Sequence, residues 1–501
     1  MGDASSGFAT PHSFRSSLIW YGCALLACLF VAFLNNGALY YFDTAGYLAQ
    51  GKSTLASIGI SPPQPGGAAA AGAATGQAPD AVVVGNRSAI YSALVTGLFY
   101  TVGPWGVVVF HTLALIVTVW LVARICARLF DHGYSVAATT GIPILVAALS
   151  ALPFYTAYLM PDIFAPILIM IAACFAIFGR DMTLWEIVLA LCLGCFAVVV
   201  HPSHLLIAAL LLPLVAVAAL LFSRYRWWLP PLLMGCVLLG GLAERVLFRE
   251  AVKTVRNAEV VYQPFLTARS IEDGPGLAVL ENACPDAELA TCALFEALQK
   301  SDDPWRLTAS HIMFESDPAL GSYKLLPQEV QKAVAEEQIS FFLRVLKERP
   351  FELTAAFIRN TLEQANLFSV QYTIPTASTL VNIHRVTDIA PASFEDARFL
   401  GARDKIGWVH VLHTVVYAVS ALLVVVIVVL PQKSPPLAVR GFAMVVLCGI
   451  LINAFVCGGV SQPSDRYGAR VAFLLPIAAS FIILFYAGVR RQEDDTEQPF
   501  N

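Results

Sequence analysis

Long apolar runs constrain the fold of this chain more than any other feature of its sequence. About ten of them are suited to crossing the roughly 30 Å hydrocarbon core of a bilayer. The composition agrees, because 57% of the 501 residues are hydrophobic and only 13% are charged, and the mean hydropathy is +0.69. The sequence therefore predicts an all-α polytopic membrane protein. The runs span residues 17–39, 105–127, 134–153, 157–178, 183–200, 203–222, 228–247, 408–430, 437–458 and 470–488.

The basic residues between these runs predict how the chain crosses the membrane. Short connections rich in arginine and lysine stay in the cytoplasm, and such connections follow every second run. Both termini are then cytoplasmic, and segments 40–104, 248–407 and 459–469 lie outside. The first apolar run continues well past Cys28 without a usual cleavage site, which favours an uncleaved helix. The basic residues are Arg124, Arg128, Arg180, Arg224, Arg226, Lys433, Arg440, Arg490 and Arg491.

Four parts of the chain follow from this topology. Residues 1–247 form an N-terminal membrane module of about seven spans, and its first outer loop, 40–104, contains a Pro-, Gly- and Ala-rich stretch at 61–79 that we expect to be flexible. Residues 248–407 form an extracytoplasmic, mostly helical domain. Residues 408–490 carry the last three spans, and 491–501 form a cytoplasmic tail.

The outer segment 248–407 has no strong strand pattern. Apolar residues spaced along one helical face predict a helix at 327–347, and Pro350 opens a second helix that reaches about Phe368; these two helices could lie along the membrane surface. Arg269 lies in a polar stretch that borders an acceptor site or forms a structural turn. Cys284 and Cys292 lie on the oxidising side of the membrane, which favours a disulfide over two unpaired thiols.

The stretch "FDTAGYLAQGKST", residues 42–54, fits two incompatible interpretations. From Gly46 it matches G-x-x-x-x-G-K-[ST], a phosphate-binding loop. Such a loop needs a preceding strand and a following helix, whereas here a membrane helix comes first. We therefore reject the nucleotide-binding interpretation and take Asp43 as the feature of interest. Asp43 is either a solvated helix end or a functional acid, and Tyr40, Tyr41 and Tyr47 predict an interfacial aromatic belt around it.

Two further groups lie on the same predicted side. Asp162 opens the fourth span, where an unpaired aspartate costs about 2.5–3.5 kcal/mol, so it is either a helix N-cap or a second functional acid. His201 and His204 lie between the fifth and sixth spans. Two histidines at this spacing can share a metal, but no third ligand follows at a diagnostic distance, so turn histidines are the alternative.

The connection before the last span carries two arginines four residues apart, Arg466 and Arg470, next to Tyr467. Guanidinium groups bind phosphate through paired hydrogen bonds. Cations oppose the dipole at a helix start, and a bound anion would remove that conflict. Ordinary anchoring at the membrane interface is the alternative.

Taken together, these motifs resemble the GT-C superfamily of membrane glycosyltransferases, which includes protein mannosyltransferases and the aminoarabinose transferase of lipid A. The resemblance covers roughly residues 15–250 and 408–488. It rests on the order and common side of four short motifs: Asp43 with Tyr47, Arg87 with Tyr91, Pro161 with Asp162, and Arg466 with Tyr467.

The resemblance implies a transferase that uses a sugar on a polyprenyl-phosphate carrier and an acceptor in the envelope. Asp43 would be the general base for an acceptor hydroxyl, and Asp162 would orient substrate or help hold a divalent metal. Arg466, helped by Arg470, would neutralise the departing phosphate. Arg87 would contact the donor phosphate or the lipid headgroups, and Tyr91 and Tyr467 would belong to the same substrate- and phosphate-binding site.

Two other classes of function remain open. Asp43 is followed by Thr44, where many relatives have a second acid, so a catalytically silent envelope assembly protein is one alternative. A lipid or glycan transporter or flippase is the other, although transporters place their polar groups at mid-membrane. The net charge of −4 gives no sign of nucleic-acid binding. We expect a bacterial inner membrane with the active face in the periplasm.

Overall fold

The computed structural model describes residues 14–60, 82–130, 133–222, 226–285, 288–387, 389–394, 396–429 and 436–497. The predicted flexible stretch at 61–79 lies outside these residues. Helices dominate the rest of the chain. In the N-terminal part they are α1 (Phe14–Leu34), α2 (Phe42–Ser57), α3 (Ala89–Thr101), α4 (Pro104–Leu129), α5 (Val136–Ala147), α6 (Leu152–Ala157), η2 (Pro161–Ile163), α7 (Phe164–Phe178), α8 (Leu184–Val199), α9 (Pro202–Phe222) and α10 (Leu229–Arg256).

The remaining elements follow in two groups. The outer segment holds α11 (Phe265–Glu272), α12 (Pro275–Ala283), α13 (Thr291–Leu298), η3 (Pro304–Leu307), α14 (Ala309–Phe314), η4 (Tyr323–Leu325), α15 (Gln328–Glu348), α16 (Pro350–Asn366), η5 (Val370–Thr373), α17 (Ala377–Thr387), η6 (Pro391–Phe394) and η7 (Arg403–Lys405). The C-terminal part holds α18 (Gly407–Val429), α19 (Leu437–Phe455), the π-helical turn η8 (Val456–Val460), α20 (Asp465–Ala472) and α21 (Leu474–Glu497).

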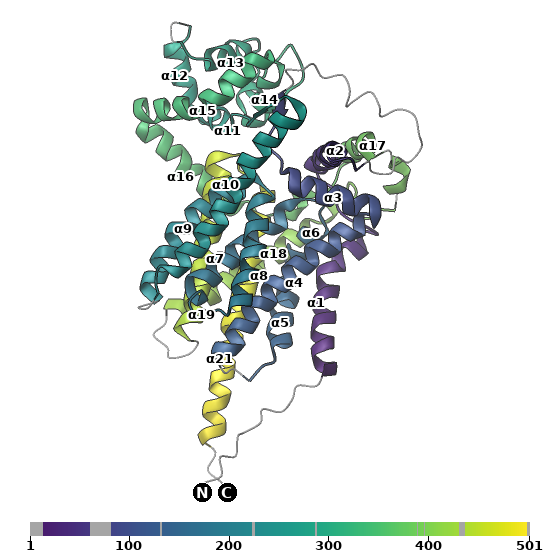
Figure 1. Cartoon of the computed structure of the whole chain (residues 1–501), viewed down its shortest axis with the longest axis vertical. Helices are drawn as coiled ribbons and strands as arrows, with labels where there is room; N and C mark the ends of the chain where they lie inside the picture. The colour runs from purple at the N-terminus through teal and green to yellow at the C-terminus, as the bar shows by residue number, and fades with distance from the viewer. Residues whose placement is uncertain are drawn as a thin grey trace.

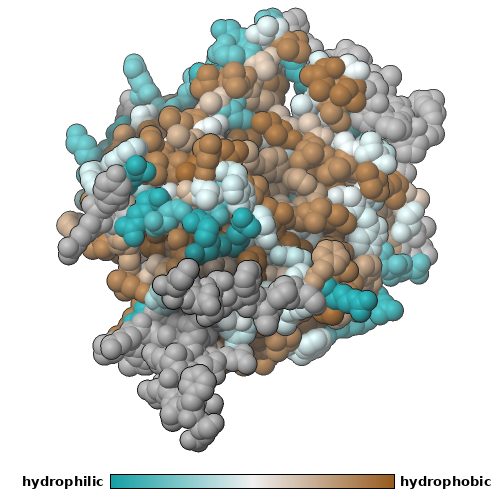
Figure 2. All heavy atoms as spheres, turned by 60° about the horizontal axis from the view of Figure 1, so that its bottom comes forward, coloured by the Kyte–Doolittle hydropathy of each residue, from teal (hydrophilic) through white to brown (hydrophobic). Residues whose placement is uncertain are grey.

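The helical bundle has the surface of a membrane protein. Among the described residues, eight helical segments are long and apolar enough to cross a bilayer. They are Phe14–Leu34, Pro104–Leu129, Pro161–Phe178, Pro202–Phe222, Leu229–Arg256, Gly407–Val429, Leu437–Val460 and Asp465–Ala487. Many large apolar side chains on these helices are exposed, and Figure 2 shows them covering much of one face between smaller polar patches. Such a surface is stable only in contact with lipid, so the chain is a multi-pass membrane protein.

Each predicted apolar run contains a helix, but two of these helices are short. Val136–Ala147 and Leu184–Val199 fall below the length of the eight long segments. In the first case the helix ends early, because residues 148–151 form a turn in which the Ala151 amide donates a hydrogen bond to the Tyr417 hydroxyl (3.1 Å). This partner lies on α18, far along the chain, so the apolar sequence itself gave no sign of the break.

The outer segment divides between two hydrophobic cores. Residues from α11 to α16 form their own core, which includes Leu280, Ile312 and Phe341, and these helices gather at one end of the bundle (Figure 1). Residues 370–406 instead join the main core of the membrane module. Helices α15 and α16 form close to where they were predicted, but α15 buries Val334 and Phe341 in the domain core and exposes Ile339. The face predicted for the membrane surface is thus packed against protein.

A small parallel sheet connects the first outer loop to the inserted segment. Strand β1 (Val82–Val84) pairs with β2 (Glu259–Val261), with Val83 opposite Val260. The pairing extends to Gly85, whose amide donates to the Val261 carbonyl (2.9 Å). Because α3 starts a few residues after β1, this sheet fixes the position of Arg87 relative to the end of α10.

Candidate functional site

The stretch at 42–54 lies entirely within helix α2, so it forms no phosphate-binding loop. Its glycines serve helix packing. A Cβ atom at Gly51 would lie 2.1 Å from the Ser92 carbonyl oxygen on α3, a distance that only glycine avoids. Lys52 donates to the Val386 carbonyl on α17. The small side chains therefore allow α2 and α3 to approach closely, which places Asp43 and Arg87 side by side.

Backbone pairing brings the two predicted acids together. The Leu39 amide donates to the Ala157 carbonyl (2.9 Å), and the Leu159 amide donates to the Leu39 carbonyl (3.0 Å). The Thr44 hydroxyl, in the first turn of α2, donates to the Leu159 carbonyl (3.3 Å). Since Asp43 directly precedes Thr44 and Asp162 closely follows Leu159, this pairing holds both carboxylates at one end of the bundle.

Asp162 is fully buried and holds two arginines. Its carboxylate accepts hydrogen bonds from Arg466 Nη2 (2.7 Å) and Nε (3.1 Å) and from Arg470 Nη1 (3.2 Å). Arg470 also donates to the Asn453 side-chain oxygen (2.9 Å). Charged groups without water need such partners. Two cations at the start of α20 oppose the helix dipole, and the sequence predicts a bound anion that would offset them. In the structure the carboxylate of Asp162 takes that place.

Asp43 is the accessible member of the group. Its side chain is 35% exposed, whereas those of Arg466 and Asp162 are 5% and 0% exposed. It accepts a hydrogen bond from Arg466 Nη1 and another from Arg87 Nη2 (3.2 Å). We call Asp43, Asp162, Arg87, Arg466 and Arg470 the arginine–aspartate cluster. A ligand from outside would first meet Asp43 and the 36% exposed Arg87.

The arginine–aspartate cluster carries more positive than negative charge. Three arginines share two aspartates through ion pairs, which leaves one positive charge without a carboxylate in the cluster. Burial alone would raise the pKa of Asp43, but the Arg466 and Arg87 charges outweigh it and lower that pKa overall. Asp43 is therefore ionised at neutral pH, and the excess positive charge favours a negatively charged ligand.

Aromatic rings enclose the arginines. The Arg466 guanidinium lies 4.9 Å from the ring centroid of Tyr41, and Arg470 lies 4.9 Å from that of Tyr467. Arg87 lies 5.8 Å from the Tyr47 ring. These contacts stabilise cations in fixed positions. Because Tyr47 is almost fully buried, it packs inside the protein and does not belong to the lipid-facing aromatic belt that was predicted.

Tyr91 lies just beneath the cluster and is fully buried. Its hydroxyl pairs with His111 Nε2 (3.1 Å), and its ring meets that of Tyr47 edge to face. The side chain predicted to lie beside substrate is thus a supporting residue under Tyr47 in this structure. His111 was not singled out in the sequence, because a histidine inside an apolar run carries no pattern of its own.

The two histidines of the α8–α9 turn do not point at a common ligand. The Ser203 amide donates to His201 Nδ1 (3.2 Å), so this nitrogen is an acceptor and the ring is neutral. Burial, followed by the Arg470 charge, lowers the pKa of His201 to about 3. His204 Nδ1 bonds to the Ala197 carbonyl (2.7 Å). Within the described residues no three His, Cys, Asp or Glu side chains form a metal-binding group, and arginines occupy the carboxylates of Asp43 and Asp162.

Other predicted residues lie elsewhere. Arg269 pairs with its neighbours Glu272 and Asp273 (both 2.6 Å) inside the inserted domain, apart from the arginine–aspartate cluster. Cys284 and Cys292 are joined by a disulfide with Cα atoms 5.6 Å apart. This bond closes the short loop between α12 and α13.

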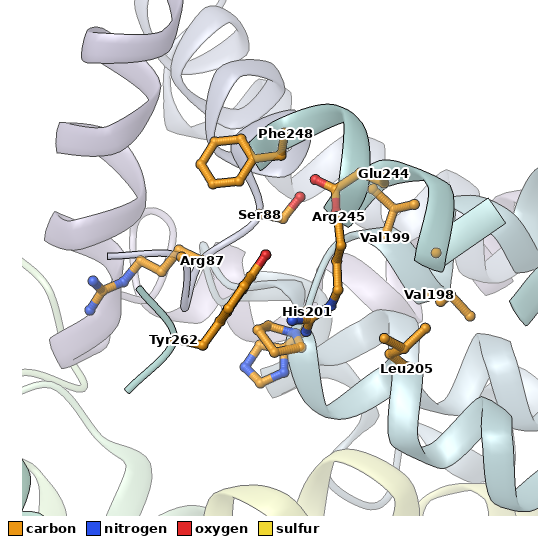
Figure 3. A pocket seen from close by; sticks show the side chains of 13 residues that line it. Arg87, Ser88, Val198, Val199, His201, Leu205, Glu244, Arg245, Phe248 and Tyr262 are labelled. Carbon is orange, nitrogen blue, oxygen red and sulfur yellow. The ribbon is translucent and has the colours of Figure 1, made fainter. Parts of the chain in front are cut away.

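A pocket beside the cluster was missed by the sequence analysis. Arg87 and His201 line it together with Glu244, Arg245 and Tyr262 (Figure 3). Glu244 and Arg245 fall inside the apolar run 228–247, where two adjacent charges are costly in lipid. This cost is the feature of the sequence that could have indicated a polar site at Glu244 and Arg245. In the structure α10 continues to Arg256, so these residues lie near its middle.

The sequence was compared with known proteins. No model of a known protein family matches the chain, and no curated protein matches it significantly. The chemistry of the arginine–aspartate cluster is therefore the basis for assigning a function.

Proposed function

We propose that this protein is an integral-membrane glycosyltransferase of the GT-C type. It would transfer a sugar from a polyprenyl-phosphate donor to an envelope glycan, lipid or protein, on the periplasmic side of a bacterial inner membrane. The main support is a partly exposed carboxylate, Asp43, in contact with a cluster in which three arginines, two of them buried, face two aspartates. A base and an anion site in contact are the two groups that transfer from a phosphate carrier requires.

In the proposed reaction the acceptor, the donor and the residues of the cluster each have a defined role. An acceptor hydroxyl oxygen attacks the anomeric carbon of the donor sugar, and the bond from that carbon to the phosphate oxygen breaks. The electron pair leaves with the phosphate, and the hydroxyl proton passes to Asp43. Arg87 and Arg466 stabilise the negative charge that develops on the leaving phosphate. No oxidant or reductant is needed.

Binding of the donor would also activate the base. In the structure Asp43 is held by Arg87 and Arg466, and a carboxylate paired with two cations is a weak base. A donor phosphate competes for the same guanidinium groups. When it draws them away, the pKa of Asp43 rises and the carboxylate becomes a better proton acceptor. Asp162 keeps Arg466 and Arg470 in place during this exchange, which is a positioning role.

The same ion pairs favour one alternative. If arginines hold Asp43, the accessible acid of the cluster, permanently, the protein would be a catalytically silent envelope assembly protein. A lipid or glycan flippase would also use a cluster that binds phosphate headgroups. Neither alternative breaks the bond between the sugar and its carrier phosphate, so turnover of a labelled polyprenyl-phosphate sugar by the purified protein separates a transferase from both.

A substrate-accumulation experiment tests the proposal. The gene is deleted, polyprenyl-linked sugars are extracted and quantified, and the strain is complemented with wild type, Asp43→Asn or Asp181→Asn. Asp181 is a matched control, because it forms an exposed pair with Arg180 away from the cluster. We expect a lipid-linked sugar to accumulate and to be cleared by wild type and Asp181→Asn alone. An unchanged lipid pool, or full clearance by Asp43→Asn, would contradict the transferase proposal.

A further inference from the structure

The pocket next to the arginine–aspartate cluster has polar groups that the proposed chemistry does not use. It lies between the end of β1, the α8–α9 turn, the middle of α10 and the residue after β2. It is a small depression that is partly open to solvent. Figure 3 shows Tyr262 in the middle of the pocket, with Glu244 and Arg245 reaching in from α10 and His201 below.

Three of these groups, the side chains of Glu244, Arg245 and Tyr262, have no hydrogen-bond or ion-pair partner within the part of the chain that the structure describes. Glu244 and Arg245 make no ion pair within 4.0 Å, since neighbouring residues on a helix point about 100° apart. The Tyr262 hydroxyl donates no hydrogen bond. The only specific contact between them is the Arg245 guanidinium, 4.9 Å from the Tyr262 ring centroid. Half-buried polar groups that lack protein partners are available to a ligand.

The combination of groups indicates the class of ligand. Glu244 accepts hydrogen bonds only, Arg245 donates them only, and a tyrosine hydroxyl does both. A phosphate would be repelled by Glu244, and a cation would be repelled by Arg245. A neutral group with several hydroxyls satisfies both, because each hydroxyl donates one hydrogen bond and accepts others. The leucine and valine side chains of the pocket, Val198, Val199 and Leu205, suit the apolar face of a sugar ring.

The pocket also adjoins the candidate base. Arg87 lines the pocket, and its guanidinium Nη2 donates a hydrogen bond to Asp43. His201 lines it as well and is close enough to Asp43 to influence its pKa. A sugar ring held by Glu244 and Arg245 would therefore lie next to Arg87, which contacts Asp43.

We propose that this pocket binds one sugar ring of the acceptor, so that the acceptor is a glycan and neither a protein nor a simple lipid. That the bound sugar is an acceptor rests on the proposed transferase function. The binding of a hydroxyl-rich ring in this pocket does not depend on that function. Because the pocket is open on one side, the rest of the glycan stays outside the protein. Glu244 and Arg245 select the ring, and Asp43 receives the proton from one of its hydroxyls.

Binding measurements on the full-length protein test this inference. The probe is a fluorescently labelled oligosaccharide pool released from the envelope of the host, and its affinity is read by fluorescence polarisation. Glu244→Gln and Arg245→Gln are compared with Glu250→Gln and Arg249→Gln, the adjacent charges on the same helix, which are 58% and 60% exposed. We expect the first two to weaken binding at least tenfold and the other two to change it less than twofold. Tyr262→Phe, which only removes a hydroxyl, should weaken it two- to fivefold.

Other outcomes overturn the inference. Equal binding by all variants, or no saturable binding of any oligosaccharide, would contradict a sugar pocket. Competition by inorganic pyrophosphate that depends on Arg245 would show an anion site instead. Asp43→Asn separates the two proposals: we expect it to bind the probe like wild type and to transfer nothing. If wild type also transfers nothing while binding still depends on Glu244 and Arg245, the transferase proposal fails and the sugar pocket stands.

Discussion

The arginine–aspartate cluster and a group of arginines and acids in the inserted domain, which we call the insertion cluster, differ in charge balance. The insertion cluster consists of Arg269, Glu272, Asp273, Arg359 and Asn360. Its two arginines face two acids, and Asn360 donates to both oxygens of Asp273 (2.9 Å each). The arginine–aspartate cluster has three arginines for two acids, and its main acid–arginine contacts join residues that are 304 and 423 positions apart.

This difference separates a structural network from a candidate site. In the insertion cluster every charge has a partner of opposite sign, and only Arg359 among its charged groups is largely exposed. Such a network ties α11 to α16 and has no need of a ligand. The arginine–aspartate cluster has an unmatched positive charge and an accessible acid. Charge balance and accessibility, more than burial, distinguish the two.

The largest effect should come from removing the central acid of the arginine–aspartate cluster. Asp162→Ala leaves Arg466 and Arg470 buried without their main partner, and breaking a buried pair costs about 3–5 kcal/mol. We expect the free energy of unfolding of the purified protein in detergent to fall by this amount. Asp181→Ala, at an exposed ion pair, should cost less than about 1 kcal/mol. Equal stability of the two variants would show that Asp162 does not hold the cluster together.

A substitution in the insertion cluster should lower the stability less than Asp162→Ala does, and it should not change the transfer activity. Asp273→Asn weakens the contacts to Arg269 and Asn360, but Glu272 still holds Arg269. We expect a loss of about 1–3 kcal/mol in the free energy of unfolding and an unchanged rate of sugar transfer per folded molecule. A large loss of transfer at normal stability would instead indicate that this cluster borders the acceptor, which is the other interpretation of the sequence around Arg269.

The helices were predictable because spans in lipid have a simple requirement, about twenty apolar residues. Their ends were less predictable. In an evenly apolar run nothing marks where a helix stops, and the break after Ala147 depends on Tyr417 from a distant helix. The division of the outer segment between two cores was also hidden, since it depends on which surfaces meet after folding.

The residues of the site were partly predictable from their common side of the membrane. Asp43, Asp162, Arg466 and Arg470 lie in connections that the topology placed together, and the structure brings them into contact. The pairing between them was not predictable, because a sequence shows that an arginine is available but not whether an aspartate already holds it. The pocket at Arg245 depends on the β1–β2 pairing, for which three-residue strands give almost no pattern.

A smaller effect should follow from Gly46→Ala in α2. The added Cβ would lie 2.5 Å from Arg87 Cζ, so it would push the guanidinium away from Asp43 without meeting backbone. An exposed pair contributes about 0.2–1 kcal/mol, and we expect the transfer rate to fall by up to about fivefold. Gly97→Ala in α3 is the control, because no atom lies within 4 Å of its added Cβ. If both variants transfer equally well, the position of Arg87 has no influence on the reaction.

The smallest effect should be a shift of the pH profile. Asp43 is active as the carboxylate and its pKa is lowered by Arg466 and Arg87 against the effect of burial, so activity is present above that pKa and is lost as the pH falls through it. With the pKa of His201 near 3, kcat/KM, which reports the protein before the donor raises the pKa of Asp43, should be level from about pH 8 down to about pH 5, with no inflection at the ordinary histidine pKa of about 6.5.

Arg87→Gln removes one of the two cations beside Asp43. The pair is more than a third exposed, so its loss of about 0.2–1 kcal/mol should raise the pKa of Asp43, and with it the acid limit of activity, by less than about 0.7 pH unit. Arg249→Gln, distant from Asp43 on the exposed face of α10, should leave the profile unchanged. An acid limit near pH 6.5 in wild type would show that a histidine, and not Asp43, carries the proton. That result would also remove the functional difference between the arginine–aspartate cluster and the insertion cluster, since neither would then contain a titrating base.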